Sequence, residues 1–281
     1  MFVVAGVTGK TGSAAAKALA AAGRRVRGLT RRDGAAVDGV KTAAAALDDA
    51  DALTRAFEGA EGAYLLCPPD LADPDPIGMY ARTAAAGAKA ARAAGVRRIV
   101  LLSSAGAHLP HGTGPVRGLH EAERILADAV PEVVMLRPAS FMDNWRAMVG
   151  PTREGGVLPT FFADLDAAMP TVSTRDIGAA AAALLLEDAP PRVVELGGPA
   201  DCSVNDIART FAAALGRDVH PVQPPRDAWQ GVLEGSGVGP AYAALLVEMY
   251  DGLNSGHMRF EGVPDQRRGE VTLAETVADW V

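Results

Sequence analysis

The segment GVTGKTG, residues 6–12, follows the apolar run FVVA (residues 2–5) and precedes SAAAKALAAAG (residues 13–23), a helix-forming stretch that ends in glycine. A glycine loop that runs into Gly-Lys-Thr also occurs in ATP-binding P-loops. A P-loop needs another glycine five residues before the glycine of Gly-Lys-Thr. That position is Val4, inside the expected strand, so the spacing excludes a P-loop.

The spacing Gly6-x-x-Gly9-x-x-Gly12 instead fits the loop that binds the pyrophosphate of a dinucleotide. The first glycine allows a tight turn, the second lets the backbone approach the phosphates, and the third lets helix and sheet pack closely. The N–H groups and dipole of the next helix then hold the anion. A purely structural turn is the alternative. The expected cofactor contacts here are Gly6, Thr8, Gly9, Lys10, Thr11 and Gly12, with Lys10 on the surface beside the cofactor.

Strands and helices alternate from this loop onward. The expected strands are residues 2–5, 25–29, 40–44, 63–67, 97–104 and 133–138. The expected helices are residues 11–22, 47–57, 77–94 and 121–129. Strands that alternate with helices in this way form parallel sheets. The sequence therefore predicts an α/β fold, a Rossmann-like doubly wound parallel sheet with helices on both faces.

The pattern loosens after residue 138. We predict an NAD(P)-binding Rossmann domain over residues 1–150 and a smaller α+β C-terminal lobe over residues 151–281, which completes the substrate cleft. Short strands at 171–173 and 193–196, with the helix between them, are expected to return to the main sheet within residues 170–200.

Composition and charge narrow the possible partners. The 281 residues carry a net charge of −7, which argues against nucleic-acid binding, because phosphate backbones favour basic faces. The longest apolar run, residues 177–186, is about half of the ~20 residues that a membrane span needs. Cys67 and Cys202 lie far apart and are expected as reduced thiols in a cytoplasmic protein without a signal peptide. We expect a small-molecule substrate and either a monomer or a homodimer.

The end of the second strand indicates which dinucleotide binds. NAD sites usually place an acidic residue there, about 20 residues beyond the glycine loop, to bind the ribose 2′-OH. Here the sequence is Leu29-Thr30-Arg31-Arg32, and no carboxylate occurs before Asp33. Two guanidinium groups suit a 2′-phosphate. We therefore predict that NADP(H) is preferred and that NAD(H) is possible, with Arg31 as the 2′-phosphate ligand.

Motifs along almost the whole chain extend this interpretation: GVTGKTG, LTRR, ALDD, LLCPP, VLLSSAG, LHEAERIL, LRPASFMDNW, VSTRDIGAAAAALL, RFEG and TLAETVADW. With these motifs the chain resembles the NmrA-like family of atypical short-chain dehydrogenases/reductases, and more closely its NAD(P)H:quinone oxidoreductase branch. LRPxxFMxN followed by TRDIGAAAA is more specific to this family than the glycine loop. The resemblance implies a nicotinamide cofactor and a reductase.

The resemblance also implies roles for individual positions. On the cofactor side it implies Asp48, beside Leu47, at the adenine, and Cys67, Pro68 and Pro69 along the nicotinamide ribose. Around the nicotinamide it implies Ser103 and the stretch Pro138 to Phe141. For the substrate it implies Ser104, Met142, Asn144 and Trp145.

One departure from short-chain dehydrogenases bears on the chemistry. Their Tyr-x-x-x-Lys dyad donates a proton to the substrate carbonyl. None of the four tyrosines here has a lysine four residues later. His120, in HEAER, and Ser103 are the catalytic candidates, His120 as a proton donor. A surface histidine on a solvated helix is the alternative for His120.

The missing dyad fits an acceptor that needs little acid help. We therefore predict hydride transfer from NAD(P)H to a quinone or a conjugated aromatic ketone, such as a tailoring step on an aromatic polyketide. Two alternatives stay open. One is a non-catalytic NADP sensor that regulates a partner, and the other is an isomerase with His120 or Asp143 as base. His108 and His111 lie three residues apart in a loop without nearby carboxylates or thiols, so no metal site is expected.

Overall fold

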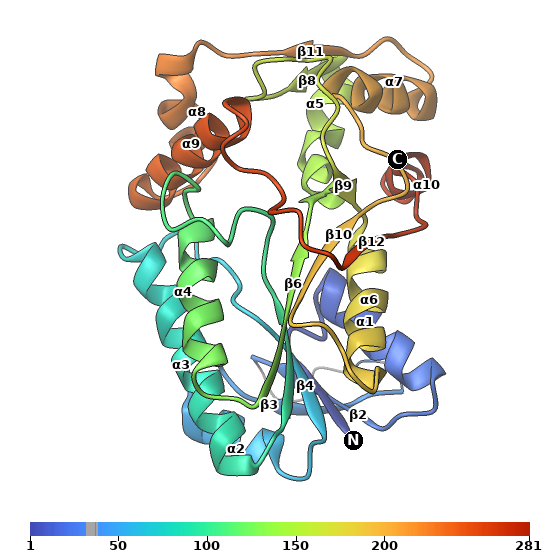
Figure 1. The fold of residues 1–281 in the computed structure, drawn as a ribbon. Coiled ribbons are helices and arrows are strands. Elements are labelled where there is room, and N and C mark those ends of the chain that lie inside the picture. Colours follow the sequence, from blue (N-terminus) through green and yellow to red (C-terminus); the bar gives the residue numbers. More distant parts are fainter. Residues whose placement is uncertain (32–36, 38) are drawn as a thin grey trace.

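Eight parallel strands form the central sheet of the computed structural model, which describes residues 1–31, 37 and 39–281 (Figure 1). The strand order is β12-β10-β6-β5-β4-β1-β2-β3. The strands are β1 (Phe2–Val4), β2 (Val26–Thr30), β3 (Lys41–Ala44), β4 (Gly62–Leu66), β5 (Arg98–Leu102), β6 (Glu132–Pro138), β10 (Val193–Gly197) and β12 (Gln266–Arg268). The predicted Rossmann-like doubly wound fold is confirmed.

Helices cover both faces of this sheet (Figure 1). One face carries α1 (Lys10–Ala21) and α6 (Thr174–Leu186), and the other carries α2 (Ala50–Phe57), α3 (Pro76–Ala94) and α4 (Val116–Ala127). Neighbouring strand residues point to opposite faces, so Val3 packs beneath α2 to α4 and Val4 beneath α1 and α6. Both faces are buried, which explains why the strands are almost wholly apolar.

Local signals in the sequence set several helix boundaries. Helix α2 begins at Ala50, three residues later than expected, because the Asp49 carboxylate accepts the N–H groups of Asp51 and Ala52 at 3.0 and 2.9 Å. Helix α3 begins with Pro76 and ends at Gly95, which has a φ of +68°. Helix α4 begins at Val116, earlier than the expected residue 121.

The order of the strands reverses at β1. Strand β1 pairs with β2 on one side and with β4 on the other. Crossovers leave this point in opposite directions, so the loops after the two strands separate and leave a crevice at the carboxyl ends of the strands. The glycine loop after β1 lies at this point.

The remaining chain forms a lobe above the carboxyl ends of the strands (Figure 1). Two small parallel pairs belong to it, β7 (Ser140–Phe141) with β9 (Thr171–Val172) and β8 (Val157–Pro159) with β11 (His220–Val222). Its helices are η1 (Met142–Met148), α5 (Val149–Gly155), α7 (Val204–Leu215), η2 (Arg226–Ala228), α8 (Trp229–Gly235), α9 (Pro240–Asn254) and α10 (Leu273–Ala278). None of the helices in the described residues is long and apolar enough to cross a bilayer.

Strands β10 and β12 extend the main sheet beyond β6, so the strand expected at 193–196 does return to it. The expectation was wrong for the strand at 171–173, because β9 pairs with β7 in a separate small sheet. Strand β12 was not expected, because its sequence, Gln-Arg-Arg, carries no apolar signal. It forms through pairing of Glu195, Leu196 and Gly197 with Gln266 to Arg268. The two-domain division at residue 150 stays a prediction.

Helices α1 and α6 pack at very close range. A Cβ added at Gly178 would lie 2.6 Å from the backbone nitrogen of Ala15 and 2.7 Å from the carbonyl oxygen of Thr11. Backbone atoms at that range cannot make room by a change of rotamer. Gly178 thus sets how closely α6 approaches the helix that follows the glycine loop.

We predict that Gly178→Ala lowers the free energy of unfolding by about 1–3 kcal/mol, because the methyl group forces α1 and α6 apart. Urea unfolding followed by circular dichroism measures this change. Gly150→Ala in α5 is the control, since nothing lies within 4 Å of its Cβ position. The control should be neutral or stabilise by up to about 1 kcal/mol. Equal stability of the two variants would contradict the close-packing argument.

Candidate functional site

Two of the three positions of the glycine loop require glycine, Gly6 because of its backbone conformation and Gly12 because backbone atoms leave no room for a side chain. Gly6 has a φ of +61°, and a Cβ there would lie 2.9 Å from Leu66 Cδ2. A Cβ at Gly12 would lie 2.6 Å from the carbonyl oxygen of Ala5 and closer still to that of Gly6. At Gly9 a Cβ would meet only the Gly6 oxygen, at 3.2 Å, and the space around it is otherwise open to 4 Å.

Helix α1 presents its first N–H groups without a capping side chain. Gly9 is the residue before the helix, and no side chain of the described residues caps this end. The first turn, Lys10-Thr11-Gly12, contains no acidic residue. The unpaired N–H groups and the positive end of the helix dipole therefore suit an anion at this point.

A cleft of about 640 Å³ opens beside this helix end. It brings together eight of the predicted cofactor residues, namely Gly6, Thr8, Gly9, Thr11, Arg31, Asp48, Pro68 and Pro69. Arg32 and Asp33, the neighbours of Arg31, lie outside the described residues. The cleft therefore joins the end of β1 to the segments that follow β2, β3 and β4, as expected at a switch point.

Sequence reasoning missed the outer wall of the cleft. Residues of α3 and the loop before it line that side, including Asp70, Leu71, Asp73, Met79, Arg82 and Thr83. Arg82 pairs with Asp73 at 2.9 Å and with Asp75 at 3.0 Å, and the Leu71 carbonyl accepts the N–H of Gly239 at the start of α9. No motif signals these residues, because only the packing of α3 and α9 brings them to the cleft.

Cys67 lies behind the cleft. Its side chain is buried, and burial raises the pKa of the thiol to about 12. Its sulfur contacts the Tyr80 carbonyl oxygen at 3.9 Å. The thiol is therefore protonated near neutral pH and fills space. Cys67 itself does not line the cleft, whereas Leu66 before it and Pro68 and Pro69 after it do.

A buried ionic network lies under the end of β5. The Ser103 hydroxyl donates to Glu123 Oε1 at 2.6 Å, and Arg137 donates to the same carboxylate through Nε at 2.8 Å and Nη2 at 2.6 Å. The side chains of Glu123 and Arg137 are each 6% exposed. These bonds orient the Ser103 hydroxyl away from bulk solvent. The catalytic role of Ser103 stays a prediction, and the structure adds that its hydroxyl already has a buried acceptor.

The network continues into the RFEG segment near the C-terminus. Arg137 Nη1 pairs with Glu261 at 2.5 Å. The buried Glu195 carboxylate on β10 accepts the backbone N–H groups of Glu261, Gly262 and Val263 at 2.5, 3.0 and 3.2 Å. This segment is thereby held across the ends of β6 and β10.

Two histidines lie near the network. The Nδ1 atom of His120 lies 2.8 Å from the carbonyl oxygen of Ala107. A carbonyl only accepts, so Nδ1 carries the hydrogen and the neutral ring has only an acceptor left at Nε2. His120 can therefore donate a proton to a substrate from Nε2 only as the imidazolium. Burial lowers the pKa of His108, whose Nδ1 has no hydrogen-bond partner among the described residues.

Some of the residues predicted to contact the nicotinamide or the substrate lie in the core, and others lie at the surface. Pro138 ends β6 and Phe141 ends the short strand β7. Met142 is fully buried and Trp145 is 8% exposed, and both belong to the core of the C-terminal lobe, where Trp145 stacks on Phe162. Met142 therefore packs in the core and does not line a pocket, because β7 and η1 turn its side chain inward.

The two remaining predicted substrate residues are more accessible. Ser104 is half-buried, and its hydroxyl donates to the Ala105 carbonyl at 3.0 Å. Asn144 is exposed. Their substrate contacts stay predictions.

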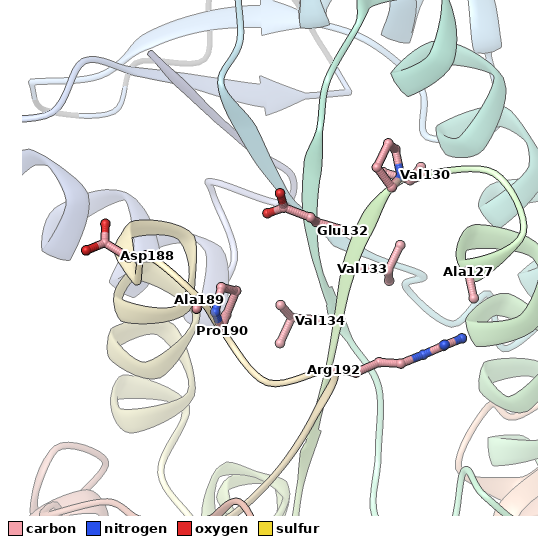
Figure 2. Close-up of a pocket in the computed structure, with 10 residues that line it drawn as sticks. Ala127, Val130, Glu132, Val133, Val134, Asp188, Ala189, Pro190 and Arg192 are labelled. Carbon is pink, nitrogen blue, oxygen red and sulfur yellow. The ribbon is translucent and has the colours of Figure 1, made fainter.

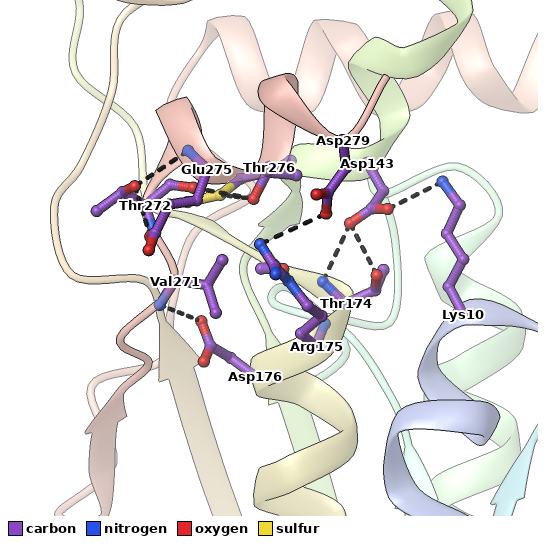
Figure 3. Close-up of polar contacts among 12 residues, drawn as sticks. Lys10, Asp143, Thr174, Arg175, Asp176, Val271, Thr272, Glu275, Thr276 and Asp279 are labelled. Atoms are coloured by element: carbon purple, nitrogen blue, oxygen red, sulfur yellow. Dashed lines mark hydrogen bonds and ion pairs between the residues drawn. The ribbon is translucent and has the colours of Figure 1, made fainter. Parts of the chain in front are cut away.

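Lys10 forms an ion pair that the sequence did not indicate. Its Nζ lies 2.9 Å from Asp143 Oδ1 (Figure 3). Asp143 Oδ2 accepts the Thr174 N–H at 3.1 Å and the Thr174 hydroxyl at 2.8 Å. Burial alone raises the pKa of Asp143, but the hydrogen bonds from Lys10 and Thr174 outweigh it and hold that pKa below its usual range. Asp143 is thus a paired carboxylate.

A second cavity lies at the opposite end of the sheet (Figure 2). It has a volume of about 410 Å³ and lies where β6 and β10 begin, between Glu132, Asp188 and Arg192. Apolar residues such as Val133, Val134 and Pro190 line the rest. Among the described residues no group of histidine, cysteine or carboxylate side chains is placed to hold a metal. The chemistry-bearing side chains gather at the carboxyl end of the sheet.

We predict that Glu123→Leu and Arg137→Leu each lower the free energy of unfolding by about 3–5 kcal/mol, because each leaves a buried charge without its buried partner, Arg137 keeping only the more exposed Glu261. The double variant should cost less than the sum of the two. Urea unfolding of the four proteins measures the coupling. Arg124→Ala, which removes an exposed ion pair with Glu121 on the same helix, should change stability by less than about 1 kcal/mol. Strict additivity of the two leucine variants would refute the coupling.

Known proteins resemble this chain over most of its length. The model of the NmrA-like family matches residues 1–263. The chain is 29% identical over 260 residues to a Bacillus subtilis (strain 168) protein named "Uncharacterized oxidoreductase YesF", with 91% of this chain and 85% of the relative covered. It is 27% identical over 256 residues to the NAD(P)H azoreductase of Xenophilus azovorans, with 89% and 86% covered.

One solved structure shows the same fold over the full length. It is an NADPH-dependent quinone oxidoreductase from Escherichia coli in complex with NADPH. Its TM-score is 0.81 at 23% identity, and 99% of each chain is covered. The resemblance therefore includes the C-terminal lobe as well as the central sheet.

Proposed function

Because the chain belongs to the NmrA-like family, we propose that it is an NADPH-dependent reductase that passes hydride to a quinone or another conjugated acceptor. One observation carries this proposal. The uncapped end of α1, with open space beside Gly9, faces a cleft of about 640 Å³ at the switch point of the sheet. This is the place where parallel α/β sheets bind dinucleotides.

The residues that line the cleft fit the parts of NADPH. Thr8, Gly9 and Thr11, with the first N–H groups of α1, would hold the pyrophosphate. Asp48 and Arg31 line the same cleft, and Arg31 offers a guanidinium for the 2′-phosphate. The relatives named NAD(P)H azoreductase and NADPH-dependent quinone oxidoreductase support this cofactor.

The positions of the four tyrosines favour a hydride acceptor that needs little acid catalysis, because none of them is placed as a proton donor on α4. Tyr64 is a fully buried residue of β4, Tyr80 and Tyr242 pair through their hydroxyls at 3.1 Å, and Tyr250 packs against Phe161 and Phe162. None of them lies on α4, where His120 contacts the Ala107 carbonyl oxygen through Nδ1. When bound, NADPH supplies the hydride. The protein supplies binding and alignment, which can account for ~7–11 kcal/mol of a barrier.

The substrate class follows from the same chemistry. A quinone accepts hydride readily and can take its proton from water, with imidazolium His120 as a further donor. We propose quinones and conjugated aromatic ketones, including intermediates of aromatic polyketides, as the acceptors. The names of the azoreductase and quinone oxidoreductase support a conjugated acceptor.

We predict that Gly9→Ala weakens NADPH binding at least tenfold, on the order of 1.4 kcal/mol, while the fold stays intact. The methyl group enters the open side of the loop that the pyrophosphate needs, and the φ of −93° and ψ of 176° at Gly9 are open to alanine. NADPH fluorescence titration and thermal melting measure the two effects. Gly150→Ala is the control. Unchanged NADPH affinity in Gly9→Ala would place the cofactor elsewhere.

We predict that Arg31→Ala lowers affinity for NADPH about tenfold and leaves NADH unaffected, because a charge-assisted bond to the 2′-phosphate is lost. Cofactor oxidation at 340 nm with a panel of quinones and azo dyes measures both cofactors. Arg24→Ala, an exposed arginine just before β2 and remote from the cleft, should keep the wild-type preference. An equal loss with NADH would argue against the 2′-phosphate role. Tight NADPH binding without turnover on any acceptor would favour the sensor alternative.

A further inference from the structure

The chain of contacts Lys10–Asp143–Thr174 links three segments that are far apart in sequence (Figure 3). Lys10 is the first residue of α1, next to Gly9. Asp143 is in η1, immediately after the segment 138–142. Thr174 is the first residue of α6, which packs against α1 through Gly178.

The three groups differ in exposure. The Lys10 side chain is 42% exposed and that of Asp143 is 11% exposed. Asp143 Oδ1 contacts Lys10, and Asp143 Oδ2 accepts the backbone N–H and the hydroxyl of Thr174. Both carboxylate oxygens are therefore held in place. An exposed lysine on its own would have many rotamers, whereas this one is directed toward η1.

We propose that Lys10 and Asp143 form a positioning bridge that holds the segment 138–145 against the phosphate-binding end of α1 and lowers the affinity for NADPH by neutralising the Lys10 charge. This inference rests on the proposed function. Asp143 is a positioning residue, since it acts through Lys10 and the 138–145 segment.

Two consequences follow from the charges. Asp143 adds a negative charge beside the site of an anionic ligand and engages the nearest lysine of the helix, so its removal strengthens anion binding. Removal of Lys10 leaves Asp143 unpaired near the same site and weakens binding. Loss of either group also removes the link to the segment that carries the predicted nicotinamide and substrate residues, which impairs alignment.

The test uses Asp143→Asn, Lys10→Met and the double variant in the full chain. Asparagine keeps an oxygen acceptor for Thr174, and methionine keeps the length of the lysine stem. Lys17→Met is the matched control, because it removes an exposed lysine from the same helix about 10 Å further along. The readouts are the Kd for NADPH by fluorescence titration at two salt concentrations, and kcat with a quinone acceptor.

We expect Asp143→Asn to bind NADPH about three- to tenfold more tightly and Lys10→Met to bind it more weakly by a similar factor. The double variant should return to near the wild-type Kd, and the differences should shrink at high salt. The kcat should fall in all three variants, including the double variant. Lys17→Met should match the wild type in both readouts.

Three outcomes would overturn the inference. Unchanged or weaker NADPH binding in Asp143→Asn would refute the neutralising role, and a merely structural loosening would show this pattern. Wild-type kcat in the double variant would refute the alignment role. Failure of the wild-type protein to bind NADPH would refute the proposed function itself, and this inference with it.

Discussion

The close approach of α1 to the end of β1 is the constraint on which the rest of the structure depends. A side chain at Gly12 would collide with the carbonyl oxygens of Ala5 and Gly6, so the helix can start this close to the strand only with glycine there. The same approach leaves the N–H groups of the first turn at the mouth of the cleft. The close packing of α1 on β1 and the suitability of this helix end for an anion therefore both follow from the glycine at position 12.

This constraint extends to α6 and, through α6, to the C-terminal lobe. Gly178 lets α6 lie directly on α1, which brings Thr174 and the segment before it close to the glycine loop. Asp143 then joins both helices by accepting from Lys10 and Thr174. The C-terminal lobe is thus held in place partly by the helix that follows the glycine loop.

The two ionic groups around the cleft have different physical consequences. The pair Glu123–Arg137 is almost fully buried and hydrogen-bonded on all sides, so it gives strong coupling and fixes the end of β5. In the pair Lys10–Asp143 the lysine is 42% exposed, so we expect a small effect on stability and a larger one on a nearby anion. Because the two pairs differ in burial, we expect Glu123–Arg137 to act mainly on the stability of the fold and Lys10–Asp143 mainly on the affinity for an anion.

The sequence by itself determined the doubly wound sheet, the glycine loop and eight of the residues that line the cleft. Those features depend on local patterns, namely strand and helix periods, glycine spacing and the residues that end β2. Asp48, Pro68 and Pro69 were expected from the family resemblance. Only the tertiary structure decided that Ser103 has the buried partner Glu123, that Met142 packs in the core, that Arg82 reaches the cleft, and that Lys10 pairs with Asp143. The partners in each of these contacts come from different segments, so packing decides whether they meet, and no local pattern records it.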